Sequence, residues 1–256
     1  MKKIKNKNIL IIVLSLALFC LISVGIYSYV NYVRNNKDGY ETLNVNSEQV
    51  KDLIYLTRGN HNSTLFFGTK YYNMYYSEDV IKTSELNEDF KKLLSYYTLD
   101  ASLLDYSTNN TVFNADDLKV QYINIFGNDK DYIDEDIYCN CPSKIIYLPS
   151  SKEYVIGGAY GMQILEGYNS KITEARKYKA KIEIYEKVVF YEEDEDAGKV
   201  NYYRDYKDGK FSTKITEISS DKQFNFDDYS KQYNTYKYTF ILQNDSYYFD
   251  SVERMK

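Results

Sequence analysis

The chain has 256 residues, and 32 Lys and Arg against 37 Asp and Glu give it a formal net charge of −5. The first 37 residues carry six positive charges and no negative ones, so subtracting six from −5 leaves −11 for residues 38–256. Nucleic acid is a poor partner for such an acidic chain, because its phosphates require neutralisation by Lys and Arg. Divalent cations, basic peptides and protein partners remain compatible with this charge.

Tyrosine is unusually frequent, with 31 Tyr and 12 Phe but no Trp. A surface rich in tyrosine is typical of proteins that bind sugars or peptides. The codon bias of an AT-rich genome would give the same composition, with tyrosines filling exposed positions of β-strands. The second interpretation is favoured, and the first stays open.

Residues 1–8 form a basic tail, and residues 9–30 form an apolar run that contains no charged residue. At about 1.5 Å per helical residue, a run of this length crosses a hydrocarbon core of roughly 30 Å. We therefore predict a transmembrane anchor over residues 9–30. A cleaved signal peptide is the alternative, since Ser23 and Gly25 offer a poor cleavage site. A buried core helix is disfavoured by the lysines that flank the run.

Four lysines precede the apolar run, whereas Arg34 and Lys37 follow it closely. The positive-inside rule then places the amino terminus in the cytoplasm and everything after about Asn31 outside the cell. We expect a single-pass protein of the cell membrane that contacts the membrane through residues 9–30. Residues 31–46 are polar and form a linker, and residues 47–256 form an extracytoplasmic domain.

Three helices are predicted in the first part of this domain. The first follows Ser47 and ends before Gly59. The second lies in SELNEDFKKLLSYYTL, where Ser84 offers an N-cap. The third begins after Asn114 and ends at Gly127. Each boundary rests on the residue types that cap helices at their two ends. Residues 71–83 are left open between strand and helix.

After Gly127 the sequence becomes rich in β-branched and aromatic residues, separated by Gly, Asn, Asp and Ser. This texture predicts strands, and the segments EEDEDAGK and QNDS predict hairpin connections. We expect an α+β fold with an N-terminal transmembrane helix, followed by two or three helices packed on an antiparallel β-meander. A division into a helical subdomain, 47–127, and a β subdomain, 128–256, is left open.

The segments YINIFG, CPSKIIYLPSSKEYVIGG and YKYTFILQNDSYYFDSVERMK together resemble uncharacterised membrane-anchored proteins of low-GC Gram-positive bacteria. The last segment is also similar to the closing strands of cystatin-like α+β domains. The resemblance implies the same fold class and an extracytoplasmic location. It assigns no catalytic residue.

The segment YCNCPS contains Cys139 and Cys141. In an extended chain these side chains share one face, with Cα atoms about 6.5–7 Å apart, at the outer limit for a disulfide. A bend at Asn140 and Pro142 would permit a local disulfide, while intermolecular bridges and free buried thiols stay open. Zinc is disfavoured, because it needs four ligands and His61 is the only histidine.

Two acidic runs are candidates for cation binding. The first supplies the carboxylates Asp129, Asp131, Asp134 and Asp136. It begins like a calcium loop, but residue 133 is Ile and residue 134 is Asp where such a loop needs an oxygen ligand and Gly. These four residues are kept as a candidate cation site. The second run, YEEDEDAG, is interpreted as a solvated hairpin loop.

No catalytic motif, cofactor motif or catalytic residue is predicted. We expect a non-enzymatic domain that binds an unidentified ligand, with a protein or peptide partner at the cell surface. The alternatives are a cell-envelope enzyme that uses paired carboxylates and a structural subunit of a membrane complex. A pocket with two inward-pointing carboxylates of raised pKa would favour the enzyme, and a sheet face closed by helices would favour the binding domain.

Overall fold

The computed structural model describes residues 39–58, 79–107, 110–128, 130–138, 144–157, 166–207 and 210–255. Leu43–Arg176 and Ala180–Lys256 form a larger compact unit, and Met1–Thr42 with Lys177–Lys179 form a second one. In the second unit, β1 (Glu41–Thr42) follows Tyr40, whose ring centroid lies 5.4 Å from that of Tyr178. The predicted anchor, residues 9–30, lies outside the described residues. No helix within the described ranges is long and apolar enough to cross a membrane.

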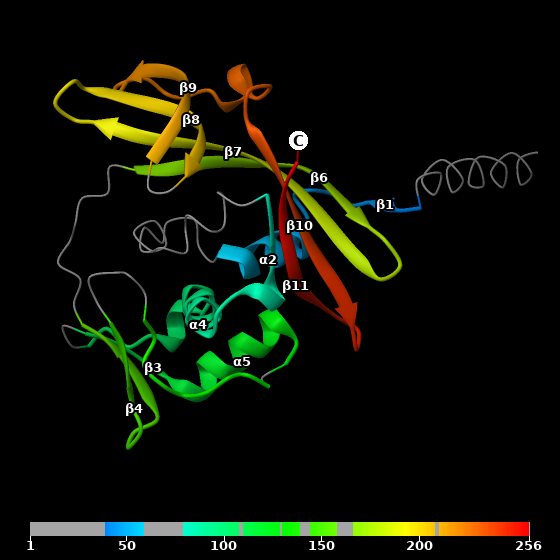
Figure 1. The fold of residues 1–256 in the computed structure, drawn as a ribbon, viewed down its shortest axis with the longest axis vertical. Coiled ribbons are helices and arrows are strands. Elements are labelled where there is room, and N and C mark those ends of the chain that lie inside the picture. The colour runs from blue at the N-terminus through cyan, green and yellow to red at the C-terminus, as the bar shows by residue number, and fades with distance from the viewer. Residues whose placement is uncertain are drawn as a thin grey trace, which may run out of the picture. The chain divides into compact units, whose positions relative to one another are not determined.

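The larger unit is built on one large antiparallel sheet, shown in Figure 1. Its strands are β2 (Val80–Lys82), β6 (Glu166–Lys177), β7 (Lys181–Asp194), β8 (Lys199–Lys207), β9 (Lys210–Ser219), β10 (Asn234–Gln243) and β11 (Ser246–Met255). Strands follow one another in the order β6-β7-β10-β11-β2. Besides β6, the long strand β7 has two partners: its first half pairs with β10 and its second half with β8, which then pairs with β9.

Both predicted hairpins are confirmed. The acidic segment EEDEDAGK joins β7 to β8 through a turn in which Gly198 has a φ of +61°. The segment QNDS joins β10 to β11, with Asn244 at φ +49° and Asp245 at +64°. Two consecutive residues with positive φ are typical of a type I′ turn, whose twist matches that of the strands.

A second, three-stranded antiparallel sheet forms from segments that lie between β2 and β6 along the chain. It contains β3 (Thr111–Asn114), β4 (Ile145–Leu148) and β5 (Glu153–Ile156), with β5 in the centre. Phe113 and Tyr154 lie opposite each other on β3 and β5, and their rings stack at 5.3 Å. The short strand β3 is held by a partner about forty residues further along the chain, which local sequence does not reveal.

The α-helices among the described residues are α2 (Glu48–Arg58), α4 (Glu88–Tyr97) and α5 (Ala115–Phe126). The predicted caps of α5 are confirmed: the Asn114 side chain accepts from the Asp116 N–H at 2.7 Å, and Gly127 ends the helix with a φ of +81°. The predicted cap Ser84 is wrong. Asn87 caps α4 by accepting from the Phe90 N–H at 2.8 Å. Ser84 lies in the short 3-10 helix η2 (Thr83–Glu85).

The predicted fold class, α+β with helices on a β-meander, is wrong. The described residues form eleven strands and only three α-helices, so the molecule is mainly β. The order is not a meander, because β10 returns to pair with β7 instead of pairing with β9. The prediction failed because hydrophobic patterns locate strands but do not show which strands pair.

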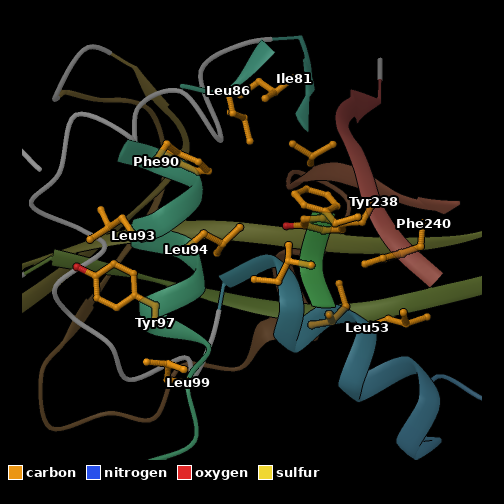
Figure 2. Close-up of a cluster of buried hydrophobic side chains, with 14 of the residues drawn as sticks. Leu53, Ile81, Leu86, Phe90, Leu93, Leu94, Tyr97, Leu99, Tyr238 and Phe240 are labelled. Atoms are coloured by element: carbon orange, nitrogen blue, oxygen red, sulfur yellow. The ribbon is translucent and has the colours of Figure 1, made fainter. Parts of the chain in front are cut away.

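Helices α2, α4 and α5 pack together against one side of the large sheet (Figure 1). Figure 2 shows Phe90 and Leu94 of α4 pointing toward Tyr238 of β10, with Leu53 of α2 nearby. All four side chains are buried in one continuous hydrophobic core. This side of the sheet, called the inner face below, is therefore closed by helices.

Candidate functional site

The large sheet has a second apolar face, opposite the helices. Val188 and Phe190 of β7 belong to the inner core, whereas Val189 between them belongs to a separate cluster with Val200, Tyr202 and Tyr233. Successive residues of a strand point to opposite faces, so this cluster marks the outer face. The β9–β10 connection, residues 220–233, covers part of the outer face with Phe224, Phe226 and Tyr229.

Stacked rings hold this connection in place. Phe224 lies parallel to Tyr202 of β8, with ring centroids 3.8 Å apart and planes 7° apart. Phe226 meets Tyr233 at 4.5 Å, and the Tyr233 hydroxyl donates to the Phe226 carbonyl at 2.9 Å. The short 3-10 helix η4 (Phe226–Tyr229) therefore rests on an aromatic base.

A groove opens between this connection and β6. Five described residues line it: Asn169, Ser170 and Lys171 of β6, and Phe224 and Phe226 of the connection. Its volume is about 420 Å³. We call it the aromatic groove. It offers two rings for apolar contact beside an amide, a hydroxyl and an ammonium group, which suits a ligand with alternating apolar and polar groups.

An exposed ion pair lies beside the groove. Lys171 Nζ donates to both carboxylate oxygens of Asp227, at 2.7 and 2.9 Å. The two side chains are 53% and 66% exposed. Exposed pairs of this kind contribute about 0–1 kcal/mol, so an incoming ligand can replace either partner at little cost.

The outer face continues from the groove toward an acidic hairpin tip. Tyr202, on which Phe224 stacks, has its pKa raised to about 12 by burial, with smaller effects from Tyr191 and Glu193. Glu193 belongs to a second hollow of about 320 Å³, lined by Glu192, Glu193, Asp194, Glu195, Asp196 and Asn201. Burial, followed by repulsion from Glu192, also raises the pKa of Glu166, the first residue of β6. The end of the sheet at the β7–β8 hairpin is therefore strongly anionic.

Two of the sequence-predicted cation ligands are used in internal contacts. Asp134 accepts from the Tyr154 hydroxyl at 3.3 Å. Asp136 accepts from the Tyr147 N–H at 2.8 Å and pairs with Lys144, and these contacts lower its pKa. Asp131 is exposed, and Asp129 lies outside the described residues. Within the described ranges, no group of three or more His, Cys, Asp and Glu is placed to hold a metal ion.

The cysteine pair is not tested by the structure. Cys139 and Cys141 both lie outside the described residues, as does His61. A local disulfide between the two cysteines therefore stays a prediction.

A buried ion pair is the most enclosed polar feature of the inner face. Arg58 at the end of α2 donates to Glu186 of β7 at 2.5 Å, and their side chains are 4% and 1% exposed. Burial lowers the pKa of Arg58, but the Glu186 carboxylate outweighs this effect and raises the pKa above its ordinary value. The guanidinium also lies 5.9 Å from the Tyr168 ring centroid. This pair links α2 to β7 on the inner face of the sheet, which the helices cover.

Sequence reasoning missed the aromatic groove. The segment QFNFDDY carried a signal, because Phe224 and Phe226 alternate with polar residues between two predicted strands. Their contacts with β6 and β8 arise only from the folded sheet.

Comparison with protein-family models, curated proteins and solved structures gives no match to the chain. The groove and the charges around it are therefore the features from which a function can be inferred. Neither a fold family nor a transferred residue role contributes to that inference.

Proposed function

We propose that the chain is a non-enzymatic, extracytoplasmic binding domain, tethered to the cell membrane by residues 9–30, whose ligand occupies the aromatic groove. The observation that carries this proposal is the groove itself: a concave site with two phenylalanine rings beside an amide, a hydroxyl and a lysine. The inner face of the sheet supports the same conclusion, because the helices close it and leave the outer face to meet a ligand.

Binding is favoured over acid–base catalysis by the residues that line the groove. The described lining contains no histidine, cysteine or carboxylate. Glu166 combines a raised pKa with a neighbouring carboxylate, Glu192, as a catalytic pair would. Neither of these two residues lines the aromatic groove, however, and Glu166 is exposed to solvent.

Site-directed photo-crosslinking in intact native cells tests this proposal and does not require the ligand to be identified first. Benzoylphenylalanine placed at Phe226 keeps an aromatic side chain in the groove, and the same probe at Val120 gives the control. Val120 is 58% exposed on α5, within the same unit. We expect discrete adducts from position 226 and none of the same mass from position 120. Equal labelling from both positions, or no adduct from either, would contradict the proposal.

A further inference from the structure

The two rings of the aromatic groove are held in place by neighbouring rings and by the backbone. Phe224 is nearly parallel to Tyr202 and to Tyr229, with planes 7° and 5° apart. Asn225, between Phe224 and Phe226, has an extended backbone with φ −97° and ψ 105°. Side chains two residues apart in an extended chain point to the same side, about 6.5 Å from each other. The groove therefore presents two half-buried rings to one ligand, with little ordering left to occur on binding.

Neither of these rings carries a polar group. The chain contains 31 Tyr and 12 Phe, yet both rings that line the groove are Phe. A phenylalanine ring offers apolar contact, and the negative charge on its faces attracts C–H groups. The part of the ligand that meets the rings is therefore apolar and presents C–H groups.

The β6 side of the groove offers donors and acceptors together. The Asn169 amide and the Ser170 hydroxyl can each donate and accept, and neither side chain is hydrogen-bonded to another described residue. Lys171 adds donors, and its partner Asp227, at 2.7 Å, adds acceptors, so their two charges cancel. A ligand that matches this side of the groove is neutral and both donates and accepts hydrogen bonds.

Sugars combine these two properties. A pyranose ring has an apolar face of C–H groups, and its hydroxyls project from the edge of the ring as both donors and acceptors. Two neighbouring hydroxyls can accept from the Lys171 ammonium and donate to the Asp227 carboxylate while the sugar face covers a phenylalanine ring. Because this ion pair is exposed, exchanging its contacts for bonds to hydroxyls costs little.

We propose that the aromatic groove binds a neutral oligosaccharide, whose sugar faces stack on the two phenylalanine rings and whose hydroxyls bond to the polar side chains of β6. This inference rests on the proposed binding function and names the class of ligand. An anionic glycan is disfavoured, because residues 38–256 carry a net charge of −11.

A proline-rich peptide is the strongest competing ligand, since such peptides dock in grooves lined by aromatic residues. Its carbonyl groups only accept hydrogen bonds, and proline has no N–H to donate. The acceptor oxygens of Asn169 and Asp227 would then gain no partner from the peptide. Sugar hydroxyls match the donors and the acceptors of the groove alike.

Calorimetric titration of the full-length protein in lipid nanodiscs tests this proposal and avoids detergents with sugar head groups. The probes are three neutral hexasaccharides: cellohexaose, maltohexaose and chitohexaose. Hexagalacturonate, which has a carboxylate on every ring, controls for charge. We expect at least one neutral hexasaccharide to bind, and hexagalacturonate to bind at least about tenfold more weakly.

Substitutions separate ring stacking from general apolar contact. Phe226→Leu keeps an apolar side chain but removes the ring, and should weaken binding of the hexasaccharide at least about tenfold, whereas Phe226→Tyr should bind like the unsubstituted protein. Tyr106→Leu removes a ring that is 62% exposed before β3, outside the groove, and should change nothing. Asn169→Ala leaves the internal hydrogen bonds of the described residues intact, so its expected loss of about fivefold reports on the ligand alone.

Failure of all three neutral hexasaccharides to bind would overturn the proposal, and so would undiminished binding by Phe226→Leu. In native cells, the adduct from position 226 lies on the tryptic peptide 223–231, and its acid hydrolysis should release sugars. Additional amino acids in place of sugars would identify a protein ligand and would overturn the choice of an oligosaccharide. These outcomes leave the groove as a binding site, whereas absence of any adduct would contradict the binding function itself.

Discussion

Gly167 shows how one residue shapes the outer face of the sheet. A Cβ atom added there would overlap Cζ and the hydroxyl oxygen of Tyr191, closer than atoms can approach. The Tyr191 ring in turn lies 6.1 Å from that of Tyr202, on which Phe224 rests. The missing side chain therefore lets the aromatic base of the groove lie close to β6.

Gly167→Ala should lower the free energy of unfolding by about 1 kcal/mol, because the Tyr191 ring must move to make room. Gly157→Ala is the matched control, since a Cβ there meets no atom within 4 Å. Its effect should be zero or slightly stabilising, because alanine restricts the unfolded chain. Urea denaturation of both variants measures the difference. Equal effects of the two substitutions would show that Tyr191 does not pack on Gly167.

The buried pair Arg58–Glu186 is expected to be the most sensitive polar contact of the inner face. Glu186→Gln removes the carboxylate that neutralises a guanidinium only 4% exposed, and should lower the free energy of unfolding by about 3 kcal/mol. Asp227→Asn removes a carboxylate from the exposed pair with Lys171 and should cost less than about 1 kcal/mol. Thermal denaturation distinguishes the two. Similar losses in both variants would mean that the Arg58 pair is not buried in solution.

At the scale of secondary-structure elements, local signals determined which boundaries could be predicted. Caps and tight turns depend on contacts within about four residues, so sequence alone located them correctly. Examples are the two α5 caps, Asn114 and Gly127, and the QNDS turn. Ser84 and Asn87 both belong to residue types that cap helices, so residue type alone could not locate the start of α4. The strand β3 could not be predicted, because its partner β5 lies far away in sequence.

The β10–β11 hairpin should gain stability from glycine. Asp245 has a φ of +64°, a conformation that costs a residue with a side chain more than it costs glycine. Asp245→Gly should therefore raise the free energy of unfolding by about 0.5 kcal/mol, since Asn-Gly is a preferred type I′ pair. Ala197→Gly, in the β7–β8 turn where φ is not positive, should lower it. A gain in both variants would contradict the type I′ assignment.

The β8–β9 hairpin should lose stability in acid. Hydrogen bonds from Lys199 and Lys214 lower the pKa of Glu217 from 4.5 to about 2. A depressed pKa stabilises the fold above the unfolded value of 4.5, and this stabilisation disappears as the pH falls toward 2. Glu217→Gln should therefore reduce the difference in unfolding free energy between about pH 5 and pH 2.5. An unchanged difference in urea denaturation would show that Glu217 makes no such contacts.

For the molecule as a whole, the sequence predicts a location, and the fold presents an outer face that carries the aromatic groove. The net charge and the apolar run of residues 9–30 predict an acidic domain outside the membrane. Both properties are sums over many residues, so they can be evaluated from sequence without the fold. The groove could not be predicted, since Asn169 and Phe226 are far apart in sequence and meet only after the sheet has formed.

A protease added to intact cells should digest the carboxy-terminal part of the chain, because the positive-inside rule places residues after about Asn31 outside. Full protection of that part would contradict the extracytoplasmic location. Exchange of residues 9–30 for an unrelated transmembrane helix should leave crosslinking from position 226 unchanged. Loss of this crosslink after the exchange would favour the alternative of a structural subunit that is recognised through its anchor.

Whether the aromatic groove is occupied in the cell is decided by photo-crosslinking from position 226, compared with position 120 and repeated in a Phe224→Ala background. Phe224 is the groove wall that stacks on Tyr202, so its removal should weaken any ligand held there. We predict a discrete adduct at 226 that is absent at 120 and diminished by Phe224→Ala. An adduct of equal intensity from position 226, from position 120 and from position 226 in the Phe224→Ala background would contradict the assignment of the groove as the binding site. So would the absence of any adduct.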